Sequence, residues 1–232
     1  LRNVAKEPEV EDLADFLNSM GASIFGAGSD EIIINGVTSL NESVFTIPAD
    51  RIEAGTYLIA AAVTYGDITI NNINSNRMNN ILDKLKLSGA EITPYENSIR
   101  LAMTENSIAP VDISTAPFPG FPTDMQAQFT VLNALSKGSA VVTENVFENR
   151  FMHVQELNRM GCDITVKGSN AFIKGVNSIT GAPVMATDLR ASASLILAGL
   201  CAEGETIVDR IYHIDRGYER IEEKLSFLGA DI

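Results

Sequence analysis

One short pattern occurs four times in the chain and constrains its fold more than any other feature. Glycine, a small residue, any residue and isoleucine follow one another from Gly21, Gly89, Gly161 and Gly229. The four glycines are 68, 72 and 68 residues apart. Self-similarity at a fixed period is typical of a fold built from repeated units that bury their apolar faces against one another. The sequence therefore predicts a repeating unit of about 70 residues.

The residues around each glycine indicate the secondary structure of the unit. Apolar residues ahead of each glycine recur every three or four positions, which places them on one face of a helix. Glycine suits the left-handed turn that ends such a helix. A second short apolar run follows the first three Gly-x-x-Ile segments, as in a hairpin. These second runs are Ile32–Ile34, Ile99–Met103 and Ala171–Ile173.

An acidic residue marks a second helix in each unit. Helical runs begin at Asp50, Asp124 and Asp188, and each ends near a glycine followed by a strand-like segment. Thr123 with Gln126 predicts a capping box, and Asp50 with Glu53 is a similar pair. One unit thus reads helix, strand, helix and hairpin. Ordinary alternation of helices and strands without true repetition is the alternative.

Composition and charge exclude several classes of function. The chain has 232 residues, of which 45% are hydrophobic, enough for a sizeable core. Its net charge of −13 argues against nucleic acid or an anionic membrane surface as the main partner. A small anionic ligand is not excluded, because a few arginines can dominate the field of a cleft. No apolar run is long enough for a transmembrane helix, so we expect no membrane partner.

The cysteines and histidines favour a protein without a metal. Cys162 and Cys201 have no metal-binding or CxxC spacing, and the two histidines lie far apart in sequence. Such residues argue against a zinc site. Both cysteines are expected to be small buried residues in a reducing cytoplasm.

The repeat also predicts the domain organisation. Residues 1–47 hold only half a unit, and we expect them to be the remnant of a domain whose other parts are missing. Residues 48–232 hold three units, which we expect to form a second domain. The chain begins inside a unit, at Leu1 rather than methionine, so it is expected to be a fragment. The segment Thr104–Phe121 is the most irregular, and the A-P-F-P-G-F-P that leads into Thr123 predicts a rigid loop. This loop either is a simple turn or holds Asp124 beside a cleft.

Four motifs carry a resemblance to a known family. They are P-T-D-M-Q-A-Q-F from Pro122, E-N-R-F-M-H from Glu148, M-A-T-D-L-R-A-S-A-S from Met185 and D-R-I-Y-H-I-D-R-G-Y-E-R from Asp209. Together they resemble the bacterial UDP-N-acetylglucosamine 1-carboxyvinyltransferases, which are enolpyruvyl transferases. The resemblance extends from A-K-E-P-E-V to the last residue and corresponds to the C-terminal part of these enzymes.

The resemblance implies a fold and a reaction. The fold is an inverted α/β barrel with helices inside, made of three βαβαββ units in each of two domains. The reaction moves the enolpyruvyl group of phosphoenolpyruvate to the 3-hydroxyl of UDP-N-acetylglucosamine and releases phosphate, the first committed step of peptidoglycan synthesis. The substrates bind between the two domains, and no metal or organic cofactor takes part. A bacterial cytoplasmic location follows from this role.

The resemblance assigns two aspartates to the active site. Asp124 matches the catalytic aspartate that contacts the sugar hydroxyl, and is the candidate base; Asp188 matches a second catalytic aspartate near the reacting centre. From the residues alone, Asp124 would equally stabilise a helix N-terminus, and the two roles are compatible. Glu7, Asp50, Arg51 and Glu53 match positions near the hinge between the domains, for which a structural or closure role is expected.

Arginines and two apolar residues complete the predicted substrate site. Phosphoenolpyruvate carries a phosphate and a carboxylate, which suit forked cationic donors. Arg150, Arg190 and Arg216 lie at or near predicted helix starts and match active-site arginines, with Arg216 also counted as catalytic. A lone arginine commonly serves in a surface ion pair, but three at repeated positions favour a site. Val146 and Phe147 match residues that line the uridine nucleotide site.

The resemblance also points to a group that the chain lacks. In the family, a cysteine or aspartate on a mobile loop of the N-terminal part acts as general acid, and neither Cys162 nor Cys201 occupies its position. The chain alone is therefore expected to lack transferase activity. Two alternatives remain: a transferase like 5-enolpyruvylshikimate-3-phosphate synthase, and a binding fragment without catalysis.

Overall fold

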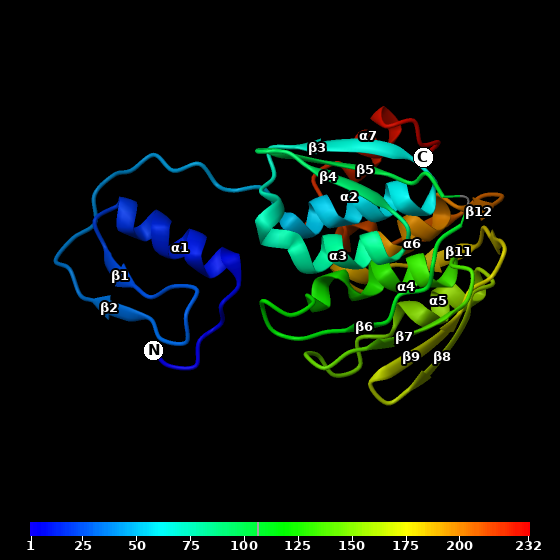
Figure 1. Cartoon of the computed structure of the whole chain (residues 1–232), viewed down its shortest axis with the longest axis horizontal. Coiled ribbons are helices and arrows are strands. Elements are labelled where there is room, and N and C mark those ends of the chain that lie inside the picture. The colour runs from blue at the N-terminus through cyan, green and yellow to red at the C-terminus, as the bar shows by residue number, and fades with distance from the viewer. Residues whose placement is uncertain (106) are drawn as a thin grey trace.

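The computed structural model describes residues 1–105 and 107–232 and has a small and a large part (Figure 1). The predicted loop segment 104–121 is thus described except for residue 106. The small part holds helix α1 and strands β1 and β2, and all later elements form the large part. No helix among the described residues is long and apolar enough to cross a membrane.

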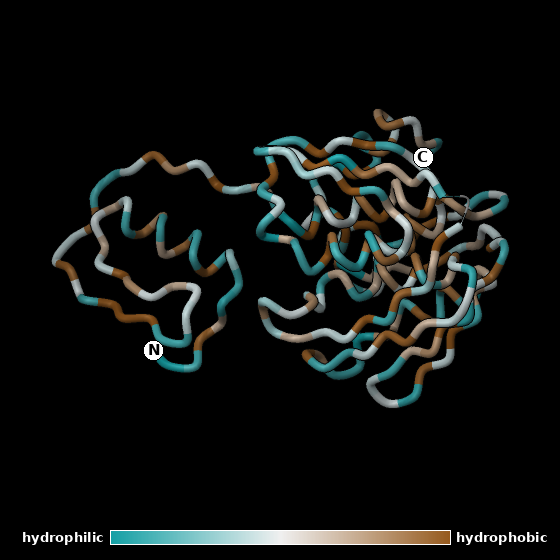
Figure 2. Tube along the Cα trace, viewed as in Figure 1, coloured by the Kyte–Doolittle hydropathy of each residue, from teal (hydrophilic) through white to brown (hydrophobic). Residues whose placement is uncertain are grey.

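Three helices pack against one another at the centre of the large part. They are α2 (Arg51–Val63), α4 (Gln126–Ala134) and α6 (Leu189–Gly199). Every residue of α4 is buried, and α2 and α6 are buried along almost their whole length. Figure 2 shows apolar segments in the middle of the large part, where these helices lie. Helices α2 and α6 are mostly apolar, which favours their burial. Helix α4 also buries polar side chains, namely those of Gln126, Gln128, Thr130 and Asn133.

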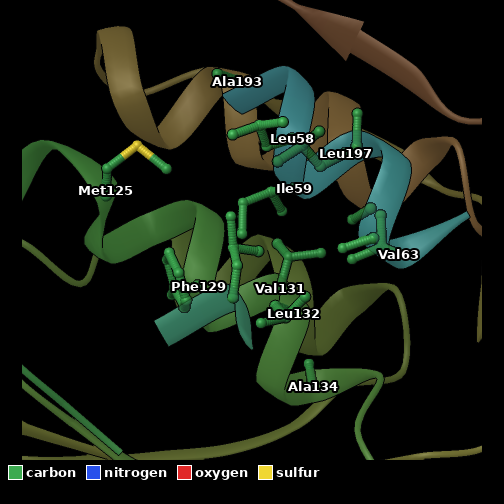
Figure 3. Packing of buried hydrophobic residues seen from close by; sticks show 14 of the residues in the cluster. Leu58, Ile59, Val63, Met125, Phe129, Val131, Leu132, Ala134, Ala193 and Leu197 are labelled. Carbon is green, nitrogen blue, oxygen red and sulfur yellow. The ribbon is translucent and has the colours of Figure 1, made fainter. Parts of the chain in front are cut away.

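The contacts between the central helices are made by large aliphatic and aromatic side chains. Figure 3 shows Leu58 and Ile59 of α2 close to Phe129 and Leu132 of α4 and to Leu197 of α6. Leu58, Ile59, Phe129 and Leu132 have no exposed surface. This cluster is the core of the large part.

The strands form an outer layer around the helices. β3 (Asp67–Asn71), β5 (Ser98–Ala102) and β4 (Glu91–Pro94) make an antiparallel sheet in that order. A second sheet has the order β6-β7-β9-β8, with β6 parallel to β7 and the other pairs antiparallel. Its strands are β6 (Ile113–Ser114), β7 (Ser139–Thr143), β9 (Asn170–Lys174) and β8 (Asp163–Lys167). Helices inside and sheets outside confirm the predicted inverted α/β barrel.

Short parallel strand pairs belong to the third unit. β10 (Ile179–Thr180) pairs with β12 (Ala202–Glu203), and β11 (Pro183–Met185) pairs with β13 (Ile207–Asp209). In the described part of the chain, three short 3-10 helices lie at the connections: η1 (Ser75–Met78), η2 (Thr123–Met125) and η3 (Ile211–His213).

The four Gly-x-x-Ile segments end four helices in the same way. The helices are α1 (Pro8–Ser19), α3 (Asn79–Leu87), α5 (His153–Arg159) and α7 (Ile221–Phe227). The glycine φ angles are +97°, +102°, +99° and +101°, a conformation that glycine adopts without strain. In each case the next residue donates its N–H to a carbonyl five residues earlier, as Ala90 does to Leu85 and Cys162 to Leu157. The predicted repeat is therefore confirmed in the backbone.

The small part lies outside the core of the large part. Its strands β1 (Ser23–Phe25) and β2 (Ile33–Asn35) form an antiparallel hairpin beside α1. Among the described residues, the core cluster begins only at Ile52. Two ion pairs join α1 to the large part: Glu9 accepts from Arg51, and Asp12 accepts from both terminal nitrogens of Arg77 at 2.6 Å.

The helix caps differ from the predicted capping boxes. Asp50 accepts from the N–H groups of Ile52 and Glu53, as expected, but Glu53 binds Lys224 instead of completing the box. The box predicted for Thr123 and Gln126 is wrong, because the segment from Thr123 is a 3-10 turn with no side-chain cap. The Thr123 hydroxyl has other partners, described below.

We expect Leu58→Ala to lower the free energy of unfolding by about 2–5 kcal/mol, because the cavity would lie between tightly packed helices. Phe227→Ala, at a side chain that is 92% exposed, should change it by less than about 0.5 kcal/mol. Chemical denaturation of both variants measures the difference. Similar losses for the two variants would contradict a core centred on α2.

Acid should destabilise the fold through His153. Burial lowers the pKa of His153 from its ordinary value of 6.5 to about 4. The folded chain therefore holds this imidazole neutral, and its contribution is complete above pH 6.5 and lost as the pH falls from 6.5 toward 4. The loss should reach about 3 kcal/mol, at about 1.4 kcal/mol per pKa unit. Denaturation of His153→Gln across this range should give a flatter pH dependence than that of the wild type; equal slopes would contradict the assignment.

Candidate active site

Two adjoining cavities lie where the central helices begin. The larger, of about 570 Å³, is lined by residues of α1, by the segment Phe45–Ile52 and by Arg77, Asp124 and Arg190. The smaller, of about 330 Å³, is lined by the loop 116–123, by Val146 and Phe147, and by residues it shares with the larger. Glu7, Arg51, Ile52 and Asp124 line both. Asp124 thus lies in the wall common to the two cavities.

The repeat brings the acidic helix starts together. Asp50 precedes α2, Asp124 lies in η2 ahead of α4, and Asp188 precedes α6. The Arg190 side chain reaches two of them, since its Nε lies 3.4 Å from an Asp124 oxygen and its Nη2 4.0 Å from an Asp50 oxygen. A cation placed between two carboxylates offsets their mutual repulsion. The packing of the three helices therefore creates a charged site at one end of the core.

Two arginines bind Asp124, one at each of its carboxylate oxygens. Arg150 donates to its Oδ1 at 2.8 Å, and Arg190 donates to its Oδ2 at 3.4 Å. Arg150 also donates to the Thr123 hydroxyl at 2.6 Å. The Asp124 side chain nevertheless keeps 39% of its surface exposed. It is oriented by the protein and still open to a ligand.

Arg190 is a buried cation packed between Asp124 and Tyr218. Its side chain is 11% exposed and lies over the Tyr218 ring, 5.3 Å from the ring centre. Its Nη1 is buried without a hydrogen-bond partner among the described residues. Burial acts to lower the pKa of Arg190, but Tyr218, Asp124 and Asp50 outweigh it and raise that pKa. The Arg190 side chain lines the larger cavity, so its charge favours an anion there.

The smaller cavity has an aromatic wall beside a cation. Val146 and Phe147 are 41% and 57% exposed, and the Arg150 guanidinium lies 4.9 Å from the Phe147 ring centre. The proline-rich loop lines the same cavity, and its Phe118 ring lies 5.7 Å from the guanidinium of Arg51. The structure therefore favours the second of the two predictions for this loop, which lines a cavity next to Asp124.

Two predicted site residues lie apart from this group. Asp188 accepts from the N–H groups of Arg190 and Ala191, so it caps α6 and fixes the start of the helix that carries Arg190. Arg216 is exposed in the segment between η3 and α7, and it forms no ion pair among the described residues. Neither residue lines the two cavities.

Sequence reasoning missed two polar residues of the site. Thr123 was assigned to a helix cap, but its hydroxyl joins Arg150 to Glu144. Glu144 drew no prediction, although a charged residue directly after the apolar strand S-A-V-V-T is a visible signal. Among the described residues, no group of three or more His, Cys, Asp or Glu side chains could hold a metal ion.

Comparisons with known proteins give consistent relatives. The family model described as EPSP synthase (3-phosphoshikimate 1-carboxyvinyltransferase) matches residues 1–225. The UDP-N-acetylglucosamine 1-carboxyvinyltransferases of Coxiella burnetii (strain RSA 493 / Nine Mile phase I) and Hydrogenovibrio crunogenus are each 59% identical over all 232 residues. The chain covers 54% and 56% of these proteins, so it spans about half the length of the curated relatives it matches.

Solved structures agree with the fold. The enolpyruvyl transferase NikO from Streptomyces tendae superposes on the whole chain with a TM-score of 0.89 and 29% identity, over 55% of its own length. An EPSP synthase from Acinetobacter baumannii matches 92% of the chain and 53% of its own, with a TM-score of 0.70 and 18% identity. The second likeness is one of fold alone.

We expect inorganic phosphate to bind the larger cavity through Arg190. Arg190→Gln should weaken that binding about tenfold or more, because a charge-assisted bond contributes about 1.5–3 kcal/mol. Arg100→Gln, which breaks the exposed Asp67–Arg100 ion pair on the outer sheet, is the matched control. Calorimetric titration at low ionic strength measures both. Equal affinities in the two variants would contradict an anion site at Arg190.

Proposed function

The chain belongs to the EPSP synthase family of 1-carboxyvinyltransferases, and from that premise we propose that it forms part of an enzyme acting on UDP-N-acetylglucosamine. This enzyme transfers the enolpyruvyl group of phosphoenolpyruvate to the 3-hydroxyl of the sugar and releases phosphate. The observation that carries the proposal is the 59% identity, over the whole chain, to two proteins named for that activity. The reaction would begin peptidoglycan synthesis in a bacterial cytoplasm.

Asp124 is the proposed base. Addition forms a bond between the sugar oxygen and C2 of phosphoenolpyruvate, so a base must take the hydroxyl proton while an acid protonates C3. Elimination then breaks the bond from C2 to the phosphate oxygen, and C3 gives up a proton. Support for Asp124 comes from its position between the two cavities and from the exposed part of its carboxylate.

The cations and the aromatic wall suit the two substrates. Arg150 and Arg190 would take the phosphate and carboxylate of phosphoenolpyruvate, because both guanidinium groups contact Asp124 in the wall between the two cavities. Arg216 is proposed to join them as a contact to phosphoenolpyruvate when the site closes. Val146 and Phe147 would line the uridine nucleotide in the smaller cavity, where an exposed ring offers a stacking surface. Asp188 would act indirectly, by capping the helix α6 that carries Arg190.

The domain arrangement is also a proposal. Residues 1–47 would belong to a first domain, and residues 48–232 would form the second, with three units around one core. The acid that protonates C3 is proposed to lie on a loop in the half of the relatives that the chain does not span. The chain by itself would then bind ligands without catalysing the transfer.

Two other functions remain to be separated from this one. A transferase acting on shikimate 3-phosphate would share the fold, but the solved EPSP synthase is only 18% identical. A binding fragment without catalysis would bind the nucleotide and contribute to no turnover. The choice of acceptor substrate and the presence of turnover distinguish the three.

We expect phosphate release only from a longer protein that contains this chain. Its release should need both UDP-N-acetylglucosamine and phosphoenolpyruvate, whereas the purified 25.0 kDa chain, checked by intact mass, should release none. Asp124→Asn in the longer protein should lower kcat by about 100-fold or more, because general base catalysis contributes about that much. Asp67→Asn, on the outer sheet, should leave kcat unchanged.

Three results would contradict the proposal. Release with shikimate 3-phosphate instead of the nucleotide sugar would move the enzyme to the other branch of the family. Release by the 25.0 kDa chain alone would contradict the location of the acid. No release from the longer protein with either acceptor would favour a binding function.

A further inference from the structure

A buried carboxylate lies behind the candidate site. Glu144 follows β7 directly and is only 3% exposed. Its Oε1 accepts from the Thr115 hydroxyl at 2.8 Å and from the N–H groups of Val146 and Phe147 at 2.8 and 3.0 Å. Its Oε2 accepts from the Thr123 hydroxyl at 2.8 Å. Four donors compensate for the removal of this charged group from water.

The first consequence concerns the wall of the smaller cavity. Two amides that lie two and three residues after Glu144 bind the same carboxylate oxygen, so the backbone turns around that oxygen. This turn leaves the side chains of Val146 and Phe147 exposed and lining the 330 Å³ cavity. Glu144 therefore shapes that wall without lining the cavity itself.

The second consequence concerns the direction of a chain of hydrogen bonds. A carboxylate can only accept and a guanidinium can only donate, whereas a hydroxyl has one proton to give. The Thr123 hydroxyl therefore gives its proton to Glu144 and accepts from Arg150 Nη1 at 2.6 Å. With Nη1 held in this way, Arg150 Nη2 points at Asp124 Oδ1, 2.8 Å away. The bonds run in one fixed direction from Arg150 through Thr123 to Glu144.

We propose that Glu144 is a positioning residue of this site, one that holds Arg150 against Asp124 and shapes the turn at Val146 and Phe147. Its kinetic consequences rest on the proposed function. A neutral amide cannot replace this carboxylate, because the amide nitrogen introduced by Glu144→Gln would offer a second donor to Thr123. The hydroxyl would then face two donors, and its own proton would have no acceptor on that side. The charge of Glu144 therefore sets the orientation of Arg150.

The direct test needs no catalysis and uses the 232-residue chain. NMR would follow the side-chain N–H signals of Arg150 and the amides of Val146 and Phe147 in Glu144→Gln, Thr123→Val and Thr123→Ser. Glu144→Gln keeps Oε1, so both amides should stay close to their wild-type shifts. The Arg150 Nη1–H that binds the Thr123 hydroxyl should exchange with water about tenfold faster or more, since a bond of about 1.5 kcal/mol or more is lost. Thr123→Val should do the same and Thr123→Ser should not.

A second hydrogen bond from a threonine hydroxyl to a glutamate carboxylate, away from the site, provides a matched control. The Thr104 hydroxyl donates to Glu91 at 3.0 Å on an exposed hairpin, so Glu91→Gln changes a similar bond far along the chain from the site. It should leave the Arg150 signal unchanged. An Arg150 signal that is equally unchanged in Glu144→Gln would overturn the proposal, whatever the chain does as an enzyme.

The kinetic test uses the longer protein and separates positioning from stability. Glu144→Gln and Thr123→Val should each lower kcat about 10- to 100-fold, matching the loss of one bond to a charged group, with KM for UDP-N-acetylglucosamine changed less than about twofold. Because both break the same sequence of bonds, the double variant should be little worse than either single variant. Unchanged kcat, or additive losses, would overturn the proposal. An inactive wild type would instead count against the proposed function, while the NMR result still decides the role of Glu144.

Discussion

The rest of the structure depends on the packing of three buried helices against one another. The apolar residues of α2, α4 and α6 leave water only because these helices contact each other and are enclosed in sheets. The strands can then expose one face and bury the other, as the alternating burial of β9 shows. This is why the helices form the inside of the barrel.

The same packing creates the site and also buries polar groups that need hydrogen-bond partners. It brings the starts of the three helices together, and with them the carboxylates of Asp50 and Asp124 and the buried guanidinium of Arg190. Beneath Arg190, the Tyr218 hydroxyl lies 3.0 Å from Thr56 of α2 and accepts from Gln128 of α4 at 3.3 Å. Several polar groups at this end of the core are thus hydrogen-bonded to one another, which offsets part of the cost of burying them.

The elements of the fold were largely predictable, because helix ends and caps depend on residues that are close in the sequence. A glycine with φ near +100° after each amphipathic helix is required by the helix end itself, so Gly89 and Gly161 could be assigned from their neighbours alone. Asp50 and Asp188 cap helices through bonds to residues two and three positions later, which is again local. Thr123 was misassigned because its partners, Arg150 and Glu144, lie 27 and 21 residues away in the sequence.

The sequence by itself determined the repeat, the order of helices and strands, and the residue types of the site, because these follow from periodicity and short-range backbone bonding. Only the tertiary structure decided which of these residues meet. It placed Asp124 between Arg150 and Arg190, left Arg216 exposed and apart, and buried Glu144 behind Thr123. The physical reason is that helix packing brings together charges far apart in the chain, and local propensity carries no information about such distances.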